Sequence, residues 1–245
     1  MGTEGLRARL ETGWKMVAAL ALMGAASSSL RAQGAKSPGV ISIRLEQKLG
    51  NVTKVVPQNT VFRNGDVLRF QITSHVSGYL YVVDEGTTGK IDTLFPDANA
   101  IAGDNSIRDG KSYAVPASGD GWFEVIGPPG FDVIYFLVSA TPISLPPPQA
   151  AGGQSTGTTE HTHPPPGMLP RCDDAIFKAR GNCIDLSAGV AALAAGAAVP
   201  QELVPLAGSA ARDIILTDDG GETAVGPAAA AKLPLIYTFR LAHRE

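Results

Sequence analysis

Oxygen-bearing side chains gather just after one strand-like run of this 245-residue chain, where they could bind calcium. Asp97, Asn99 and Asp104 supply the hard oxygen ligands that calcium prefers. Their spacing lacks the glycine and the terminal glutamate of an EF-hand loop. A turn after the strand explains them more simply, so we predict no metal site here and keep Asp97 only as a candidate ligand-binding residue.

Aromatic residues offer a different chemistry, the binding of a sugar or a peptide against exposed rings. Tyr79 and Tyr81 lie two positions apart, so both face the same side of a strand, and Trp122 follows later in the chain. A binding platform requires Trp122 and at least one of the tyrosines to be exposed on one concave face. Packing in the core is the alternative role for all three rings.

The four histidines give little support for catalysis. His161 and His163 could chelate a metal as a His-x-His pair. They lie in a Pro/Gly-rich tract, however, and two solvated histidines in a flexible segment explain them more simply. A hydrolase built on His75 would need a carboxylate and a Ser or Thr within hydrogen-bonding reach. The sequence contains no nucleophile elbow, phosphate-binding loop or dinucleotide-binding glycine pattern. We therefore expect a protein without enzymatic activity or a cofactor.

The two cysteines suggest a disulfide. Cys172 and Cys183 lie eleven positions apart, which on one unbroken helix would separate their Cα atoms by about 16 Å. A disulfide needs these atoms within about 7 Å, so the chain must reverse between them. Gly181-Asn182 supplies a break after a short helical pattern at 173–180. Two free buried thiols are the alternative, and two cysteines alone do not complete a zinc site.

The N-terminus has the three-part pattern of a secretory signal peptide over residues 1–32. A basic start precedes the uncharged apolar stretch Met16–Ala26, which is too short to span a bilayer, and Ala32 is the expected last residue before cleavage. The alternative is an amphipathic N-terminal helix of a cytosolic protein. Cleavage would remove four basic and two acidic groups, changing the net charge from −3 to −3 − 4 + 2 = −5.

These features predict an exported protein, periplasmic or extracellular, in which an oxidising environment permits the disulfide. The mature chain is mildly acidic and has no electrostatic reason to bind nucleic acid. No later segment is long and apolar enough to be a transmembrane helix.

Short apolar runs separated by Gly, Pro and Asn turns indicate strands. Gly78–Asp84 is apolar on both alternating faces, which predicts a strand in the middle of a sheet that is covered on both sides, and 131–139 has the same character. Residues 40–45 alternate instead, as in a sheet with one wet face. Strands at roughly 8 to 12 residue spacing predict a mostly β fold, an antiparallel β-sandwich of the Ig-like or a similar type.

Composition divides the mature chain into four parts. We expect a β-sandwich core, a Pro/Gly/Ser-rich flexible linker, a disulfide-containing insertion with helical and hairpin segments, and a C-terminal strand that returns to the sandwich: residues 38–143, 144–170, 171–232 and 233–245. Within the insertion, the Ala-rich stretch 185–199 suggests a helix, which Gly189 and Gly196 each oppose by about 1 kcal/mol.

Several of these segments resemble one family in the right order. They are Asn64–Phe70, Gly78–Val83, Gly89–Ile91, Leu94–Asp97 and, later, Pro129-Gly130 with Phe136–Ser139. The pattern is similar to that of the domain of unknown function 4384 family and covers about residues 58–143. The resemblance implies a β-rich domain. The family has no assigned activity or catalytic residues, so none carries over to this chain.

The sequence thus favours an exported, non-enzymatic β-sandwich of unknown role that binds a protein or cell-envelope partner. A carbohydrate-binding module is the first alternative, and it depends on the aromatic platform. A hydrolase with an unrecognised site is the second, and it depends on the surroundings of His75.

Overall fold

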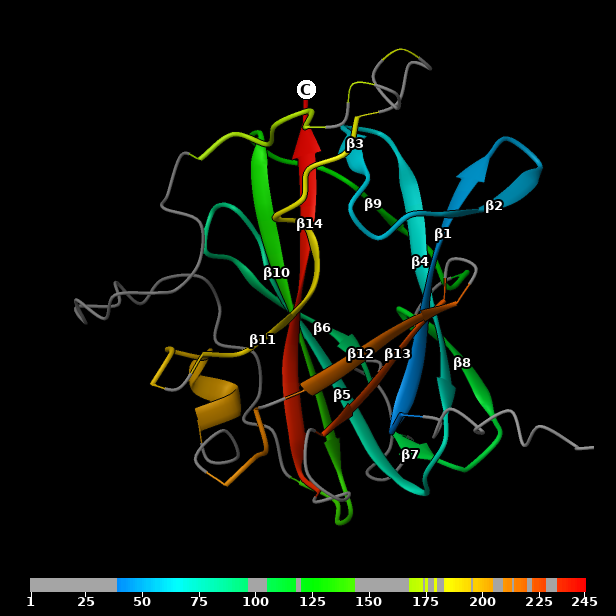
Figure 1. The fold of residues 1–245 in the computed structure, drawn as a ribbon, viewed down its shortest axis with the longest axis vertical. Helices are drawn as coiled ribbons and strands as arrows, with labels where there is room; N and C mark the ends of the chain where they lie inside the picture. Colours follow the sequence, from blue (N-terminus) through cyan, green and yellow to red (C-terminus); the bar gives the residue numbers. More distant parts are fainter. Residues whose placement is uncertain are drawn as a thin grey trace, which may run out of the picture. The chain divides into compact units, whose positions relative to one another are not determined.

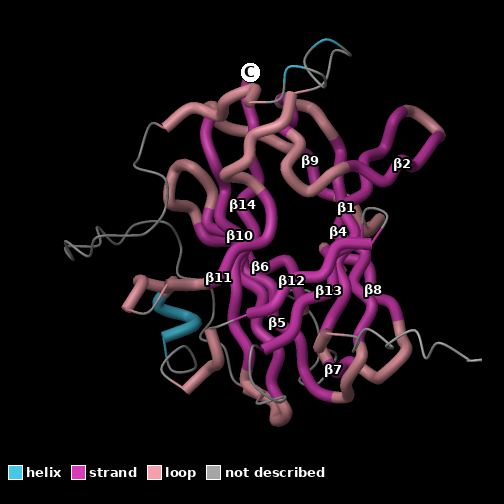
Figure 2. The backbone as a smooth tube through the Cα atoms, in the orientation of Figure 1, coloured by secondary structure: helices cyan, strands magenta, loops and turns pink. Residues whose placement is uncertain are grey.

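Strands make up most of the chain that the structure, a computed structural model, describes (Figure 2). The described residues are 39–96, 105–117, 120–143, 168–173, 175, 179, 183–194, 196–204, 209–212, 214–219, 222–227 and 233–245. The expected signal peptide, nearly all of the linker 144–170, most of the helical pattern 173–180 and Asp97 lie outside them. The described residues belong to one unit, Ser37–Glu245.

The strands form two sheets (Figure 1). The first sheet has the order β12 (Ile214–Asp219), β13 (Glu222–Pro227), β1 (Ile41–Leu49), β4 (Val67–Ser74) and β8 (Ser112–Val115), with β2 (Val52–Val56) beside β1 and β9 (Phe123–Glu124) beside β4. The second has the order β11 (Gly189–Ala192), β14 (Leu235–Arg244), β10 (Gly130–Ser139), β5 (Gly78–Glu85) and β6 (Ile91–Phe95), with β3 (Val61–Arg63) beside β14 and β7 (Ser106–Ile107) beside β5. Among the strands that the structure describes, all pairs are antiparallel except that of β3 with β14. The predicted mostly β fold is confirmed by these two sheets.

One hydrophobic core joins the two sheets. Ile41, Ile43 and Leu45 of β1 alternate toward it, as do Leu68, Phe70 and Ile72 of β4. Phe70 contacts Phe136 of β10 and Phe239 of β14 edge-on, with ring centroids 5.4 and 5.0 Å apart. Phe136 also stacks on Tyr237 at 5.2 Å. Aromatic contacts of this kind stabilise a fold beyond the area they bury, by about 0.5–1.5 kcal/mol per pair.

The outer face of the second sheet is buried as well. Its side chains are apolar, and Leu193 and Leu203 from the insertion pack on them: Tyr81, Val83, Val133, Tyr135, Leu137 and Ile236. The segment Gly78–Asp84 is therefore covered on both sides, as its sequence predicts. The outer face of the first sheet is polar instead and carries ion pairs such as Arg69–Glu46, whose Nε and Oε2 lie 2.7 Å apart.

The helical character expected of the insertion is not supported. In the Ala-rich stretch 185–199, the described residues form β11, which pairs with β14, and only the short 3-10 helix η1 (Gln201–Leu203) follows. Gly189 and Gly196 adopt φ angles of 97° and 77°, a left-handed conformation that interrupts a right-handed helix. The alanines, despite their helix propensity, therefore belong to a strand and an irregular segment that lies over the second sheet.

The final strand β14 lies inside the second sheet, between β10 and β11. It pairs with β10 from Val138↔Leu235 to Gly130↔His243, so residues 140–234 separate two neighbouring strands in the sequence. Within the described residues, no helix has the length and apolarity needed to cross a bilayer.

Candidate functional site

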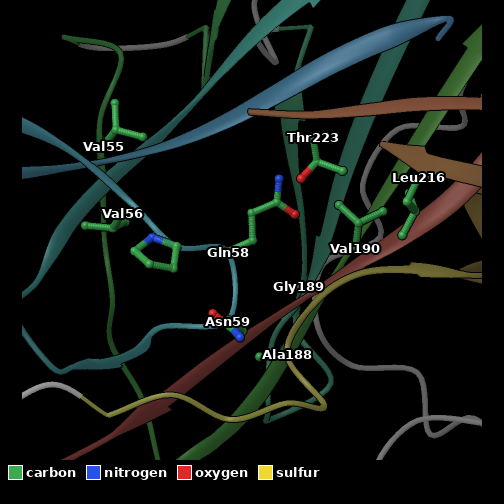
Figure 3. Close-up of a pocket in the computed structure, with 10 residues that line it drawn as sticks. Val55, Val56, Gln58, Asn59, Ala188, Gly189, Val190, Leu216 and Thr223 are labelled. Carbon is green, nitrogen blue, oxygen red and sulfur yellow. The ribbon is translucent and has the colours of Figure 1, made fainter. Parts of the chain in front are cut away.

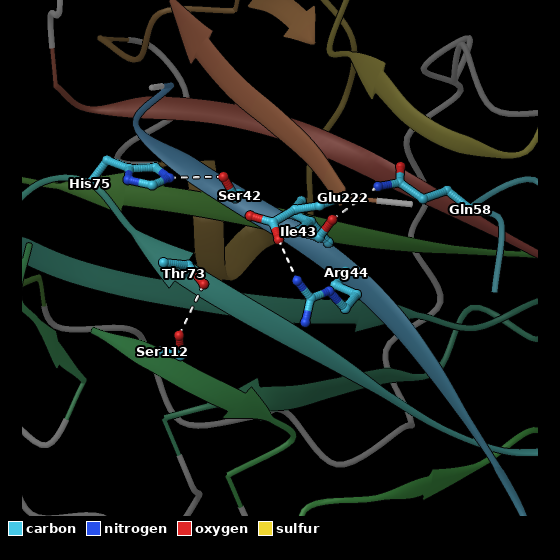
Figure 4. A network of polar contacts seen from close by, with 8 residues as sticks. All are labelled: Ser42, Ile43, Arg44, Gln58, Thr73, His75, Ser112 and Glu222. Atoms are coloured by element: carbon cyan, nitrogen blue, oxygen red, sulfur yellow. Dashed lines mark hydrogen bonds and ion pairs between the residues drawn. The ribbon is translucent and has the colours of Figure 1, made fainter. Parts of the chain in front are cut away.

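The candidate site begins where the edge of β1 changes partner. β4 pairs along one side of β1, and on the other side β13 pairs with residues 41–44 and β2 with residues 45–49. Pro57, which has no backbone N–H to continue a ladder, follows β2 directly. The next side chain, Gln58, donates from Nε2 to the carbonyl oxygen of Ile43 at 3.3 Å (Figure 4). This hydrogen bond ties the loop after β2 to β1 near the change of partner.

A pocket of about 560 Å³ adjoins this junction (Figure 3). Its walls come from three parts of the chain: the end of β2 with the loop after it, the start of β11, and the β12–β13 hairpin. The lining residues are Val55, Val56, Pro57, Gln58, Asn59, Ala188, Gly189, Val190, Leu216 and Thr223. The volume lies in the range of about 300–1,000 Å³ that is typical of ligand sites. None of the lining residues carries a charge.

The two strands beside the pocket, β11 and β12, each end their sheet. We call this side of the molecule, with the ten lining residues, the open seam. At the opposite side, where β6 and β8 end the sheets, the backbone N–H of Ala117 donates to the carbonyl of Leu94 at 3.1 Å, and the rings of Phe95 and Tyr113 meet edge-on at 6.3 Å. A backbone hydrogen bond and an aromatic contact therefore join the sheets on that side. At the open seam a backbone bond also crosses, from the N–H of Asp185 to the carbonyl of Asn59, and the pocket lies beside it.

Apolar side chains remain exposed at the open seam. Val55 is 40% exposed and Leu216 is 43% exposed, although both line the pocket. Leu216 pairs with the buried Val225, so it points toward the interior side of the first sheet, and Ile215 beside it, 55% exposed, points to the outer side. Exposed apolar groups that lie together mark interaction surfaces more often than isolated ones do.

A turn at Asp185 holds the β11 wall of the pocket in place. The Asp185 carboxylate accepts hydrogen bonds from the backbone N–H of Arg171 at 2.6 Å and from the N–H and hydroxyl of Ser187 at 2.8 and 2.5 Å. Its own N–H donates to the carbonyl of Asn59 at 2.9 Å, across to the loop wall. Burial alone would raise the pKa of Asp185, but the hydrogen bonds from Ser187 and Arg171 outweigh it and lower the pKa below its ordinary value.

The cysteine pair lies next to this turn. Cys172 and Cys183 are at disulfide distance, with their Cα atoms 4.9 Å apart, so the chain does reverse between them. The N–H of Asp173 donates to the carbonyl of Ile184 at 2.8 Å, which aligns the two segments, and the N–H of Val61 donates to the carbonyl of Cys183 at 2.9 Å. The pair therefore fastens the chain before β11 to the edge strand β3.

The structure does not bring the three candidate aromatic residues together. Tyr81 is buried on the outer face of the second sheet, where its hydroxyl donates to the carbonyl of Ile143 at 2.9 Å and accepts from its N–H at 2.5 Å. Tyr79 packs half-buried in the same cluster. Trp122 lies by the first sheet instead, 4.2 Å from the guanidinium of Arg69. The three rings form no common platform.

His75 has a hydrogen-bonding partner, but it lies away from the pocket. Its Nε2 is 2.8 Å from Oγ of Ser42, on the polar side of β1 (Figure 4). Within the described residues no carboxylate bonds to His75, and no three His, Cys, Asp or Glu side chains form a group that could hold a metal ion. The candidate ligands Asp97, Asn99, Asp104, His161 and His163 lie outside the described residues.

None of the residues that line the pocket stands out in the sequence as a binding residue. One signal was available: Ile214-Ile215-Leu216 is apolar on both faces of a hairpin strand, and such a strand lacks the alternation of a half-exposed edge. A second was Pro57 directly after a strand, followed by two amide side chains. The meeting of segments 55–59, 188–190 and 216–223 depends on tertiary structure and carries no local pattern.

Residues 61–142 match the sequence model of one family, described as Domain of unknown function (DUF4384). The resemblance is thereby confirmed for the segment from β3 to β10, and the pocket-lining residues all lie outside it. No curated protein and no solved structure matches the chain.

Proposed function

We propose that this chain is an exported, non-enzymatic β-sandwich domain that binds a protein or cell-envelope partner at its open seam. The observation that carries the proposal is the uncharged pocket of about 560 Å³ between two strands that each end a sheet.

The composition of the pocket supports recognition and not catalysis. General acid–base chemistry requires a titratable group within hydrogen-bonding reach of the reacting atom. The pocket is lined by apolar side chains with two amides and one hydroxyl, from Gln58, Asn59 and Thr223. Sites of this composition bind through apolar contact and use a few polar groups to fix orientation.

The apolar surface beyond the pocket supports a large partner. Ile215 is 55% exposed and lies on the opposite face of β12 from the pocket. A small ligand inside the pocket would leave Ile215 uncovered. A macromolecular surface could cover it together with the pocket, and the burial of apolar area is the main favourable term in such association.

Export is supported by the signal-like N-terminus and by the cysteine pair at disulfide distance. Intact mass of the protein recovered outside the cytosol tests it. We expect a mass equal to residues 33–245 less two hydrogens. A full-length mass with two alkylatable thiols would contradict both cleavage and the bond.

Site-specific photo-crosslinking tests the binding surface. A photoreactive residue replaces Leu216 in the open seam and, as a control, Ile126, which is also exposed and apolar but does not line the pocket. In cells that produce the chain, we expect one discrete covalent adduct from position 216 and none of the same mass from position 126. Equal labelling from both positions, or no adduct from position 216, would refute the proposal.

A further inference from the structure

The free edge of β12 offers a backbone ladder next to the pocket. In the described part of the chain, β12 pairs with β13 on one side only, and it ends the first sheet. An edge strand presents unpaired N–H and C=O groups, which another extended chain can use. Natural edges are usually blunted by charges, prolines or bulges, and β12 ends in the charged residues Asp218 and Asp219. Earlier in the strand, beside the pocket, Ile215 and Leu216 are exposed and apolar.

The side chains beside this edge fit an uncharged segment. Leu216 pairs with the buried Val225 and Val190 with the buried Phe239, so these two side chains line the pocket from the inner faces of the two sheets, and all ten lining residues are uncharged (Figure 3). Placing an unpaired charge against such a lining costs several kcal/mol in desolvation, so the pocket complements a neutral occupant. The side-chain amide of Asn59 makes no hydrogen bond within the described residues, and it can bond to a backbone group that enters the pocket.

The same features favour a partner segment in the extended conformation. A helix satisfies its own backbone groups and leaves the edge of β12 unused, and a lipid chain has no amide groups to offer. An added strand satisfies the edge and places alternate side chains on opposite faces, one set toward the pocket and the other toward Ile215.

We infer that the partner enters the open seam as an extended, uncharged polypeptide segment that pairs with the free edge of β12 and places an apolar side chain in the pocket beside Leu216 and Val190. The inference rests on the proposed function, because it names the kind of partner that the proposed surface takes.

The test uses a displayed library of nine-residue peptides, selected on the mature chain, followed by calorimetry with the best synthetic peptide. We expect selected peptides without charge in their central residues and with apolar residues at alternate positions. In an added antiparallel strand only every second residue directs its N–H and C=O toward the edge. Methylation of those amide nitrogens should weaken binding at least tenfold, and methylation of the intervening ones less than threefold.

Variants of the protein locate the binding. Leu216→Glu in the first sheet and Val190→Glu in the second should each weaken the peptide at least tenfold, whereas Ile126→Glu should leave its affinity unchanged. Each variant is checked for an unchanged unfolding midpoint. The amide-methylation series uses the unaltered protein, so its result stands even where a variant fails to fold.

The outcomes separate the inference from the proposed function. If methylation weakens the peptide equally at all positions, the inference of an added strand is wrong, but the proposed binding surface stands. The same holds if position 216 gives a discrete crosslinked adduct and no peptide is selected. Dimers of the chain that Leu216→Glu dissociates would overturn the inference in favour of a second copy. If no peptide is selected and no adduct forms, both the inference and the proposed function are wrong.

Discussion

The two sheets of this protein differ in what lies outside them. The second sheet is buried on both faces, because the insertion covers its outer side with Leu193 and Leu203. The outer face of the first sheet has no such apolar cover among the described residues and carries polar groups such as the pair formed by Arg44 and Glu222, 2.7 Å apart. Burial also raises the pKa of three groups that all lie in the second sheet: Asp84, Tyr135 and Tyr237.

This difference shows that the insertion supplies one of the two hydrophobic layers against which the second sheet packs. Strands that are apolar on both faces need a cover on each, and β5, β10 and β14 obtain the second cover from residues that follow β10 in the chain. Side chains on the outer face of the second sheet should therefore behave as core residues, and those on the outer face of the first as surface residues.

The largest effect is expected from truncating the covered face. Leu137→Ala removes a fully buried side chain from β10 and should lower the free energy of unfolding by about 2–5 kcal/mol, the usual cost of such a cavity. Gln71→Ala, on the outer face of β4, should change it by less than about 0.5 kcal/mol. Urea unfolding measures both. Equal effects would show that the second sheet is not covered.

The next largest effect is expected in the pH dependence of stability, which should differ between a buried carboxyl group of the second sheet and a half-exposed one of the first. Asp84 faces inward on β5, and its buried Oδ1 has no hydrogen-bonding partner among the described residues. Burial raises its pKa well above 3.8, and Asp132, Asp92 and Glu85 raise it further while Lys90 opposes them. The folded state then binds a proton that the unfolded state has released, so stability is present below about pH 4 and is lost as pH rises through the raised pKa.

Asp84→Asn removes this titration. The wild-type free energy of unfolding should fall relative to the variant as the pH rises, by about 1.4 kcal/mol for each pKa unit of the shift. Unfolding curves between pH 4 and 9 measure the difference. Glu222→Gln, which changes a half-exposed carboxylate of the first sheet, is the control and should follow the wild type. Parallel curves for wild type and Asp84→Asn would contradict a raised pKa.

A smaller effect is expected from one hydroxyl. Tyr81→Phe removes both hydrogen bonds between the outer face of β5 and Ile143 and should cost about 1 kcal/mol. Tyr113→Phe removes a hydroxyl at the edge of the first sheet that accepts from the exposed N–H of Arg108, and water can replace it at smaller cost. Thermal unfolding compares the two. A larger loss for Tyr113→Phe would reverse the contrast between the sheets.

The smallest effect is expected on the open face of the first sheet. Glu222→Gln breaks the ion pair with Arg44, whose side chain is 41% exposed, so it should cost less than about 1 kcal/mol and less still at high salt. Unfolding at 0.05 and 1 M NaCl measures this. A loss above 2 kcal/mol at both salt concentrations would mean that this face is buried in solution.

Local patterns predicted the strands well, because burial on one or two faces leaves a direct record in the sequence. The apolar run Gly78–Asp84 indicated a strand that is buried on both faces, and the alternation of 40–45 indicated that β1 has one polar face. The Ala-rich stretch 185–199 was misread, since helix propensity is weak against a strand pairing with β14 and two glycines at positive φ.

The open seam could not be predicted from local patterns. Its walls come from residues near 57, 189 and 216, and only the pairing of β14 with β11 and of β13 with β1 brings them together. The aromatic residues that the sequence did single out are divided between the two sheets, where Tyr81 packs under the insertion and Trp122 lies by Arg69. Residue type suggested a binding role for them, but position in the fold decides it.

The separation of β10 from β14 also sets the order of events during synthesis. Residues 140–234 must be made before the central pair of the second sheet can form. At about 5–20 residues per second, that interval lasts roughly 5 to 20 seconds. During it, the apolar strand β10 lacks its neighbour β14, so its apolar side chains stay without their final cover until residues 235–243 have been made.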